Sequence, residues 1–83
     1  MIVMISAYIL INMKRGYSDE AVIKLRNIEG VAKVSMIAGE YDIVTRVLVE
    51  KLKHLIKVTN KIHSIEGVEN TETHVIEKEI SDN

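Results

Sequence analysis

Stretches dense in apolar residues alternate with stretches in which apolar residues recur every three or four positions, and this change of period divides the chain into six segments. Four segments are rich in β-branched and aliphatic residues, which predicts strands over residues 1–13, 31–38, 41–49 and 68–79. The helical period predicts two helices, over residues 18–29 and 50–64. The expected order of elements is βαββαβ, followed by a short tail, Ser81–Asn83.

An eight-residue stretch occurs twice. Residues 24–31 return 37 positions later as residues 61–68, and five of the eight positions are identical. Each copy is expected to hold the last turns of a helix, a glycine that ends the helix (Gly30 or Gly67) and the start of a strand. The chain is therefore interpreted as a doubled βαβ unit.

Two right-handed βαβ crossovers in this order predict a ferredoxin-like α+β fold. The expected sheet has four antiparallel strands in the order 4-1-3-2, with both helices on one face. At 83 residues the chain forms a single domain, residues 1–83, with a thin core of its own.

The helices also carry specific expectations. Ser18 or Asp19 is placed to cap the first helix. In the second helix the inward-facing stripe is expected to comprise Leu52, Leu55, Ile56, Thr59 and Ile62. Lys53, Lys57 and Lys61 follow one another at i+4 spacing on the other side, which indicates a solvated face.

The two central strands are apolar on both faces, although the helices can cover only one. In the first strand Tyr8 and Leu10 point to the face opposite to that of Ile9. In the third strand Val44 and Leu48 point to the face opposite to that of Val47. Four six-residue strands have a flat footprint of roughly 400 Å², and a monomer rarely exposes so large an apolar patch. The pattern predicts a homodimer made by sheet-on-sheet packing, with a ligand site near the subunit boundary.

Composition excludes several classes of protein. The formal net charge of −1 provides no field that would hold a polyanion, so nucleic acid is not an expected partner. The absence of cysteine excludes disulfides and thiolate metal sites. The apolar N-terminus is too short to span a bilayer and has no basic leader, so a cytoplasmic location without a membrane partner is expected.

No arrangement of residues typical of catalysis is present. The acidic residues are scattered, no nucleotide-binding glycine motif occurs, and His54, His63 and His74 are isolated from other metal-ligating residues. The expectation is a non-enzymatic protein without metal or cofactor. If the chain were an enzyme of the dimeric ferredoxin-like type, His74 would be the candidate catalytic residue.

The segment Gly39-Glu40-Tyr41-Asp42 is the one local group with a functional pattern. Backbone N–H groups near Gly39 can bind a carboxylate, and Asp42 can pair with an ammonium group. The same residues also suit an ordinary hairpin turn. Thr71 and Thr73 project from one face of the last strand, where they serve equally well as strand formers or as ligand contacts.

Four runs in this order resemble the RAM domain, the effector-binding half of the Lrp/AsnC (feast/famine) transcriptional regulators: Ala7–Asn12, Ile28–Val31, Gly39–Asp42 and Gly67–Thr73. The resemblance implies a ferredoxin-like fold, dimers formed through the sheets, and further assembly into rings or octamers. It also implies an amino-acid effector held between dimers by Gly39, Tyr41, Asp42, Thr71 and Thr73.

The family's regulators carry an N-terminal helix-turn-helix, whereas this chain begins directly at the first strand. It therefore resembles the stand-alone RAM modules, which implies that it does not bind DNA by itself. The leading hypothesis is amino-acid sensing and oligomerisation. Two alternatives stay open: a structural partner of full-length Lrp/AsnC regulators without its own ligand, and an ACT-like regulatory domain, although the loop Asn12–Gly16 lacks the proline typical of that family.

Overall fold

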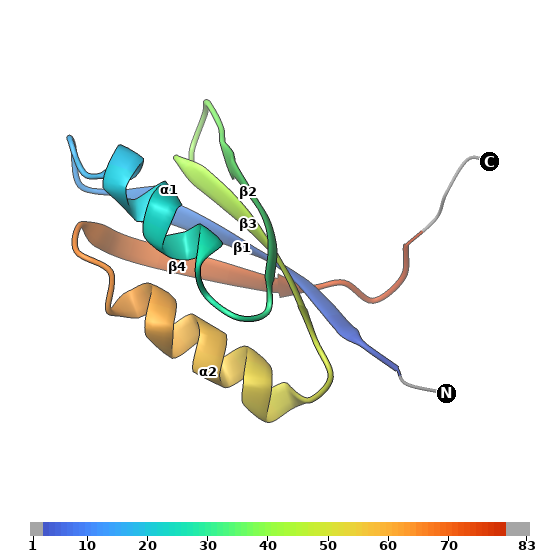
Figure 1. Ribbon diagram of the computed structural model, residues 1–83. Coiled ribbons are helices and arrows are strands. Elements are labelled where there is room, and N and C mark those ends of the chain that lie inside the picture. Colours follow the sequence, from blue (N-terminus) through green and yellow to red (C-terminus); the bar gives the residue numbers. More distant parts are fainter. Residues whose placement is uncertain (1–2, 80–83) are drawn as a thin grey trace.

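The computed structural model describes residues 3–79. Its elements are β1 (Ile5–Met13), α1 (Ser18–Arg26), β2 (Val31–Met36), β3 (Ile43–Val49), α2 (Leu52–His63) and β4 (Val68–Val75). The strands form one sheet in the order β2-β3-β1-β4, which is the predicted order read from the other edge. All the strand pairs are antiparallel. Both helices cover the same face of the sheet (Figure 1), so the predicted ferredoxin-like fold is confirmed.

The core is a single layer between the sheet and the two helices. Odd-numbered side chains of the central strands face the helices and are buried, and Ile9 and Ile11 pair across the sheet with Thr45 and Ile43. The helices close this layer with Ala21, Leu25, Leu55, Val58 and Ile62. Period-two alternation along the strands and the 3.6-residue stripe of the helices thus meet at one apolar surface.

The other face of the sheet is open in the single chain. At its centre Tyr8 and Leu48 are 39% and 42% exposed, and Leu10 and Val44 are half-buried. Polar side chains from the edge strands surround this apolar centre: Lys33, Ser35, Glu72 and His74. The apolar open face is therefore present as predicted, but its apolar part is confined to the central strands.

Both helices end four residues before their glycines, not directly at them as predicted. α1 ends at Arg26, where the Asn27 side chain donates to the carbonyl of Ile23 at 3.0 Å. A tight turn follows, closed by a Val31 N–H to Ile28 carbonyl bond at 3.1 Å. The glycine of the repeat completes this turn with positive φ after the helix has already stopped.

The start of α1 also differs from the expectation for Ser18 and Asp19. Tyr17 occupies the N-cap position, and its side chain makes no capping hydrogen bond. Ser18 and Asp19 are the first helical residues instead. Asp19 keeps a favourable place there, because a carboxylate in the first turn lies near the positive end of the helix dipole.

The inward stripe of α2 is rotated relative to the prediction. Leu55, Val58 and Ile62 are buried, whereas Leu52 and Ile56 are 61% and 52% exposed. On this side Val58 packs against Gly30, where a Cβ on the glycine would lie 3.1 Å from the valine Cγ2. The close approach is possible because the glycine has no side chain.

The strands are shorter than their apolar runs. β2 ends at Met36 and β3 begins at Ile43, and residues 37–42 form the loop that connects them. β4 ends at Val75, after which the Ile76 N–H still donates to the Ser6 carbonyl at 2.8 Å. The predicted start of the first strand at Met1 and the predicted tail lie outside the described residues. Within the described part of the chain, neither helix is long and apolar enough to cross a membrane.

Candidate functional site

Asp42 fastens the loop of residues 37–42 to the end of β1. The Met13 N–H donates to Asp42 Oδ2 at 2.7 Å, and the Asp42 N–H donates to the Ile11 carbonyl at 3.0 Å. The Asp42 carbonyl in turn accepts the Ile37 N–H at 2.9 Å. Oδ1 has no hydrogen-bond partner within residues 3–79. One carboxylate oxygen is therefore structural, and the other is free to accept from a ligand.

Tyr41 belongs to a chain of polar side chains that reaches from this loop to the edge strand β4. His74 Nε2 lies 2.6 Å from Glu72 Oε2, and Tyr41 lies beside the same Glu72 carboxylate. Partial burial and the negative charge of Glu72 raise the pKa of Tyr41 above 10.0, because both disfavour the phenolate. The hydrogen bond with His74 lowers the pKa of Glu72.

Thr71 and Thr73 share one face of β4, as predicted, and this is the face that carries the helices. They pair with Ile11 and Ile9 of β1, whose side chains point into the core. Thr71 Oγ1 lies 2.7 Å from Nε2 of His63 in α2. Glu72, by contrast, pairs with Leu10 on the open face. The two threonines and the Tyr41–Glu72 contact therefore lie on opposite faces of the sheet.

The five residues predicted for the site meet only in part. Asp42 and Thr71 lie at the same end of the sheet, since both are joined to Ile11 of β1. Gly39 stands at the exposed tip of the loop, with no atom within 4 Å of the place where a Cβ would be. None of the five lines either of the two best-formed concave regions of residues 3–79. A single chain thus presents these groups without enclosing them.

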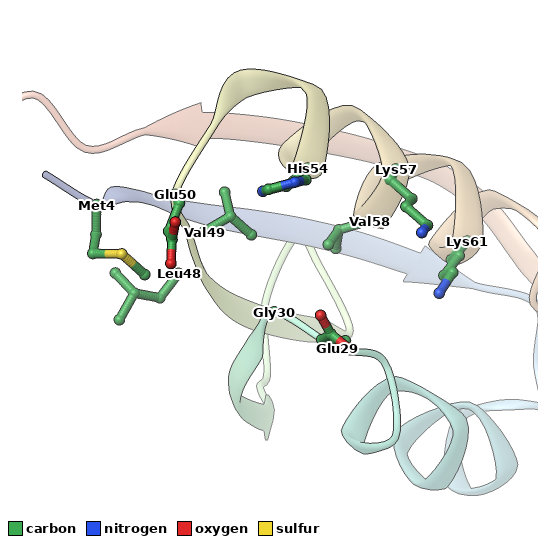
Figure 2. A pocket seen from close by; sticks show the side chains of 10 residues that line it. All are labelled: Met4, Glu29, Gly30, Leu48, Val49, Glu50, His54, Lys57, Val58 and Lys61. Atoms are coloured by element: carbon green, nitrogen blue, oxygen red, sulfur yellow. The ribbon is translucent and has the colours of Figure 1, made fainter. Parts of the chain in front are cut away.

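The larger concave region lies elsewhere and was not expected from the sequence. It is a groove of about 370 Å³ between α2 and the turn that joins α1 to β2 (Figure 2). We call it the Gly30 groove, and it is lined by Met4, Glu29, Gly30, Leu48, Val49, Glu50, His54, Lys57, Val58 and Lys61. Lys57 and Lys61 are exposed, as predicted for a solvated face, and together with His54 they form one wall of this groove.

The described residues offer few other groups that could bind a ligand or a metal ion. A smaller hollow of about 180 Å³ on the open face is lined by Tyr8, Lys33, Ser35, Val44 and Arg46. Within residues 3–79, no group of three or more histidine, aspartate or glutamate side chains is placed to hold a metal ion. The arrangement offers charged and hydrogen-bonding groups for recognition: a free carboxylate oxygen at Asp42, an exposed loop, and a groove with charged walls.

Known proteins resemble this chain in sequence and in fold. Residues 6–83 match the family model of the Lrp/AsnC ligand binding domain. The HTH-type transcriptional regulator FL11 of Pyrococcus furiosus is 34% identical over 74 residues, which are 89% of this chain and 49% of the regulator. The chain therefore spans about half the length of this curated relative.

Two solved structures have the same fold over most of the chain. TTHA0845 from Thermus thermophilus superimposes with a TM-score of 0.87 at 30% identity, covering 94% of this chain and 99% of that one. The feast or famine regulatory protein Rv3291c from M. tuberculosis, determined as a complex with L-methionine, has a TM-score of 0.78 at 26% identity over 95% of this chain and 54% of that one. Together with the family match, this shows that the chain belongs to the Lrp/AsnC ligand-binding domain family.

Proposed function

We propose that this chain is a non-enzymatic module that binds an amino acid and oligomerises, and that its effect on transcription passes through protein partners. The observation that carries this proposal is the loop held by Asp42. Its free Oδ1 suits an ammonium group, and exposed backbone N–H groups near Gly39 suit a carboxylate. The related Rv3291c was determined with L-methionine, which carries both groups.

The proposed effector site requires more than one chain. Gly39, Tyr41 and Asp42 belong to the loop, while Thr71 and Thr73 lie on the helix face of β4. A second chain that places its β4 beside the loop of the first would bring the two sets together. Binding and assembly are then linked, because a ligand that contacts two chains stabilises their association.

Direct DNA binding is not part of the proposal. The chain has 11 basic and 12 acidic residues, and this balance provides no field for a phosphate backbone. A cytoplasmic module of this kind acts by changing the assemblies of DNA-binding relatives.

A titration calorimetry experiment with L-methionine and the other common amino acids tests the effector site. Asp42→Asn should weaken binding by about tenfold or more, because it removes a charge-assisted hydrogen bond but keeps an oxygen for the Met13 N–H. Tyr41→Phe and Thr71→Val test the other two parts of the site. Thr59→Val on α2 is the matched control and should leave the affinity unchanged. Undiminished binding by Asp42→Asn would remove this carboxylate from the site.

A second function, structural co-assembly without a ligand, is favoured by one observation. The chain matches about half of FL11 with the same family fold, so its sheet can substitute for the corresponding part of a longer relative. Native mass spectrometry of the purified protein separates the two functions. An oligomer that takes up one amino acid per subunit supports sensing, whereas an assembly that stays empty and captures a full-length relative supports co-assembly.

A further inference from the structure

The helices leave one face of the sheet open (Figure 1), and the strand register arranges the side chains of this face in rows across the four strands. Two rows contain a residue from every strand. In the order β2, β3, β1, β4 the first row is Ser35, Val44, Leu10 and Glu72, and the second row is Lys33, Arg46, Tyr8 and His74. Each row has polar side chains at both ends and side chains of the central strands in its middle.

The charges of these rows are divided between the two edges of the sheet. Lys33 lies on the β2 edge and Glu72 lies on the β4 edge. Within residues 3–79 Lys33 makes no ion pair, and the carboxylate of Glu72 is paired only with His74. The hydrogen bond with His74 lowers the pKa of Glu72, which keeps this carboxylate ionised. The open face therefore has one basic edge and one acidic edge.

A second copy of the chain can lie on this face in two aligned ways. A symmetric dimer uses the same surface on both subunits, so its two-fold axis lies between the two sheets. Aligned sheets keep their strand directions within about 30° of each other, so the axis runs either along the strands or across them. An axis along the strands places β2 of one chain over β4 of the partner. An axis across the strands places β2 over β2 and β4 over β4.

An axis along the strands matches the two faces. It keeps each row at its own height and reverses its order, so Val44 lies over the partner's Leu10 and the apolar centres meet. Lys33 lies over the partner's His74, next to Glu72 on the same edge. Opposite charges across an interface favour association and fix its orientation.

An axis across the strands does not match them. It lays each row over the other row of the partner, so Arg46 lies over the partner's Val44. The two copies of Lys33 meet at one edge, and the two copies of Glu72 meet at the other. Like charges placed together at an interface oppose association. The distribution of charge on the open face therefore selects the axis along the strands.

We propose that two copies of this chain pack with β2 of each over β4 of the other, and that Lys33 of each subunit pairs with Glu72 of the partner at the rim of the interface. The arrangement rests on the oligomerisation proposed above, and it specifies which strands face each other and which charges set their orientation. It also brings β4 of the partner beside the end of β2, where the loop of residues 37–42 begins.

Cross-linking of single-cysteine variants tests the arrangement, because the chain has no cysteine of its own. Ser35→Cys on β2 and His74→Cys on β4 leave Lys33 and Glu72 in place. The two variants are co-expressed so that their subunits mix, and a short, flexible bismaleimide joins thiols across sheets that lie about 10 Å apart. The mixture should give a covalent dimer, whereas Ser35→Cys alone should not, because its two thiols lie on opposite edges of the dimer.

Charge reversal tests the ion pair, with sedimentation velocity as the measure of association. Lys33→Glu and Glu72→Lys should each weaken the dimer about tenfold or more, because each places like charges together at both rims. The protein with both changes should recover most of the lost affinity, since the pair is restored with its charges exchanged. Lys53→Glu on α2 is the matched control and should leave the dimer unchanged. Losses that simply add in the doubly changed protein would overturn the pairing.

The outcomes separate this arrangement from oligomerisation itself. A covalent dimer of Ser35→Cys alone would place β2 over β2, which would overturn the arrangement but leave the oligomer standing. A protein that stays monomeric at every concentration would overturn the arrangement together with the proposed oligomerisation.

Discussion

At the scale of single residues, Tyr17 packs more closely on Gly67 than any side chain packs on the other three glycines. The glycine has φ of +93°, and a Cβ on it would overlap the tyrosine. Gly16 has a similar φ of +89° but nothing within 4 Å of its Cβ position. A comparison of alanine variants at the two glycines therefore separates the free-energy cost of positive φ from the cost of displacing Tyr17.

We predict that Gly67→Ala destabilises the fold more than Gly16→Ala. Positive φ should cost each variant about 1–2 kcal/mol, and displacement of Tyr17 should add about 1–3 kcal/mol for Gly67→Ala alone. Urea unfolding of both variants measures the difference. Equal free energies of unfolding would mean that Tyr17 moves aside without cost.

The Tyr41–Glu72 contact makes a prediction about titration. Burial and the Glu72 charge raise the Tyr41 pKa, so Glu72→Gln should lower it toward 10.0. The contact stabilises the fold fully below the ordinary tyrosine pKa and less as the pH rises through the raised value. Phenolate absorbance measured from about pH 9 to 12 follows the change, with Tyr41→Phe to assign the signal. Glu69→Gln, which neutralises a different carboxylate of β4, should leave the pKa of Tyr41 unchanged.

At the scale of elements, Asp42 joins β1 to the loop between β2 and β3. Asp42→Ala leaves the Met13 N–H without its acceptor and should cost about 1–3 kcal/mol. Asp42→Asn keeps an oxygen at the same place and should cost less. Effector binding should weaken in both variants, so unfolding and calorimetry on the pair separate the structural role from the binding role. Equal stability of the two variants would show that the Met13 bond contributes nothing to the fold.

Much of the element order follows from local patterns, but the ends of the elements do not. The repeat and the apolar runs predict the strand order and the shared face of Thr71 and Thr73, because period and alternation are properties of the sequence. The end of α1 depends on the Asn27 side chain and the turn to Gly30. The buried side of α2 includes Val58, which packs against Gly30. The hydrophobic pattern does not predict these contacts, because they depend on side chains and turns outside the apolar stripes or on segments far apart in the sequence.

The candidate site shows the same division. The loop residues Gly39, Tyr41 and Asp42 are visible as a motif, but the bond from Asp42 to Met13 spans 29 positions and needs the folded sheet. The Glu72–His74 pair has a sequence signal, since residues at i and i+2 share a face of a strand. The Gly30 groove has no signal in the hydrophobic pattern, because it forms between α2 and the turn before β2, which are far apart in the sequence.

At the scale of the whole molecule, the chain has one core layer and one uncovered sheet face. Tyr8, Leu10 and Val44 form the apolar centre of that face, and Arg46 beside them is already paired with Glu79 at 2.8 Å. A second sheet packed over this centre would bury apolar area, whereas Lys33, which has no ion pair among residues 3–79, must stay at the rim of the interface, because burying an unpaired charge is costly. A standard interface buries about 800 Å² on each partner, which is about twice the flat footprint of roughly 400 Å², so sheet-on-sheet packing would use the whole face.

Val44→Lys should therefore break the predicted sheet-on-sheet dimer without unfolding the chain, because its side chain points away from the core and its charge would face the partner sheet. Sedimentation velocity measures the association, and Ile23→Lys, which adds the same charge to an exposed position on α1, should not change it. The Val44→Lys monomer should also lose the effector, because the proposed loop site requires two chains. A Val44→Lys protein that stays dimeric would place the interface on another surface and leave the open face without a partner.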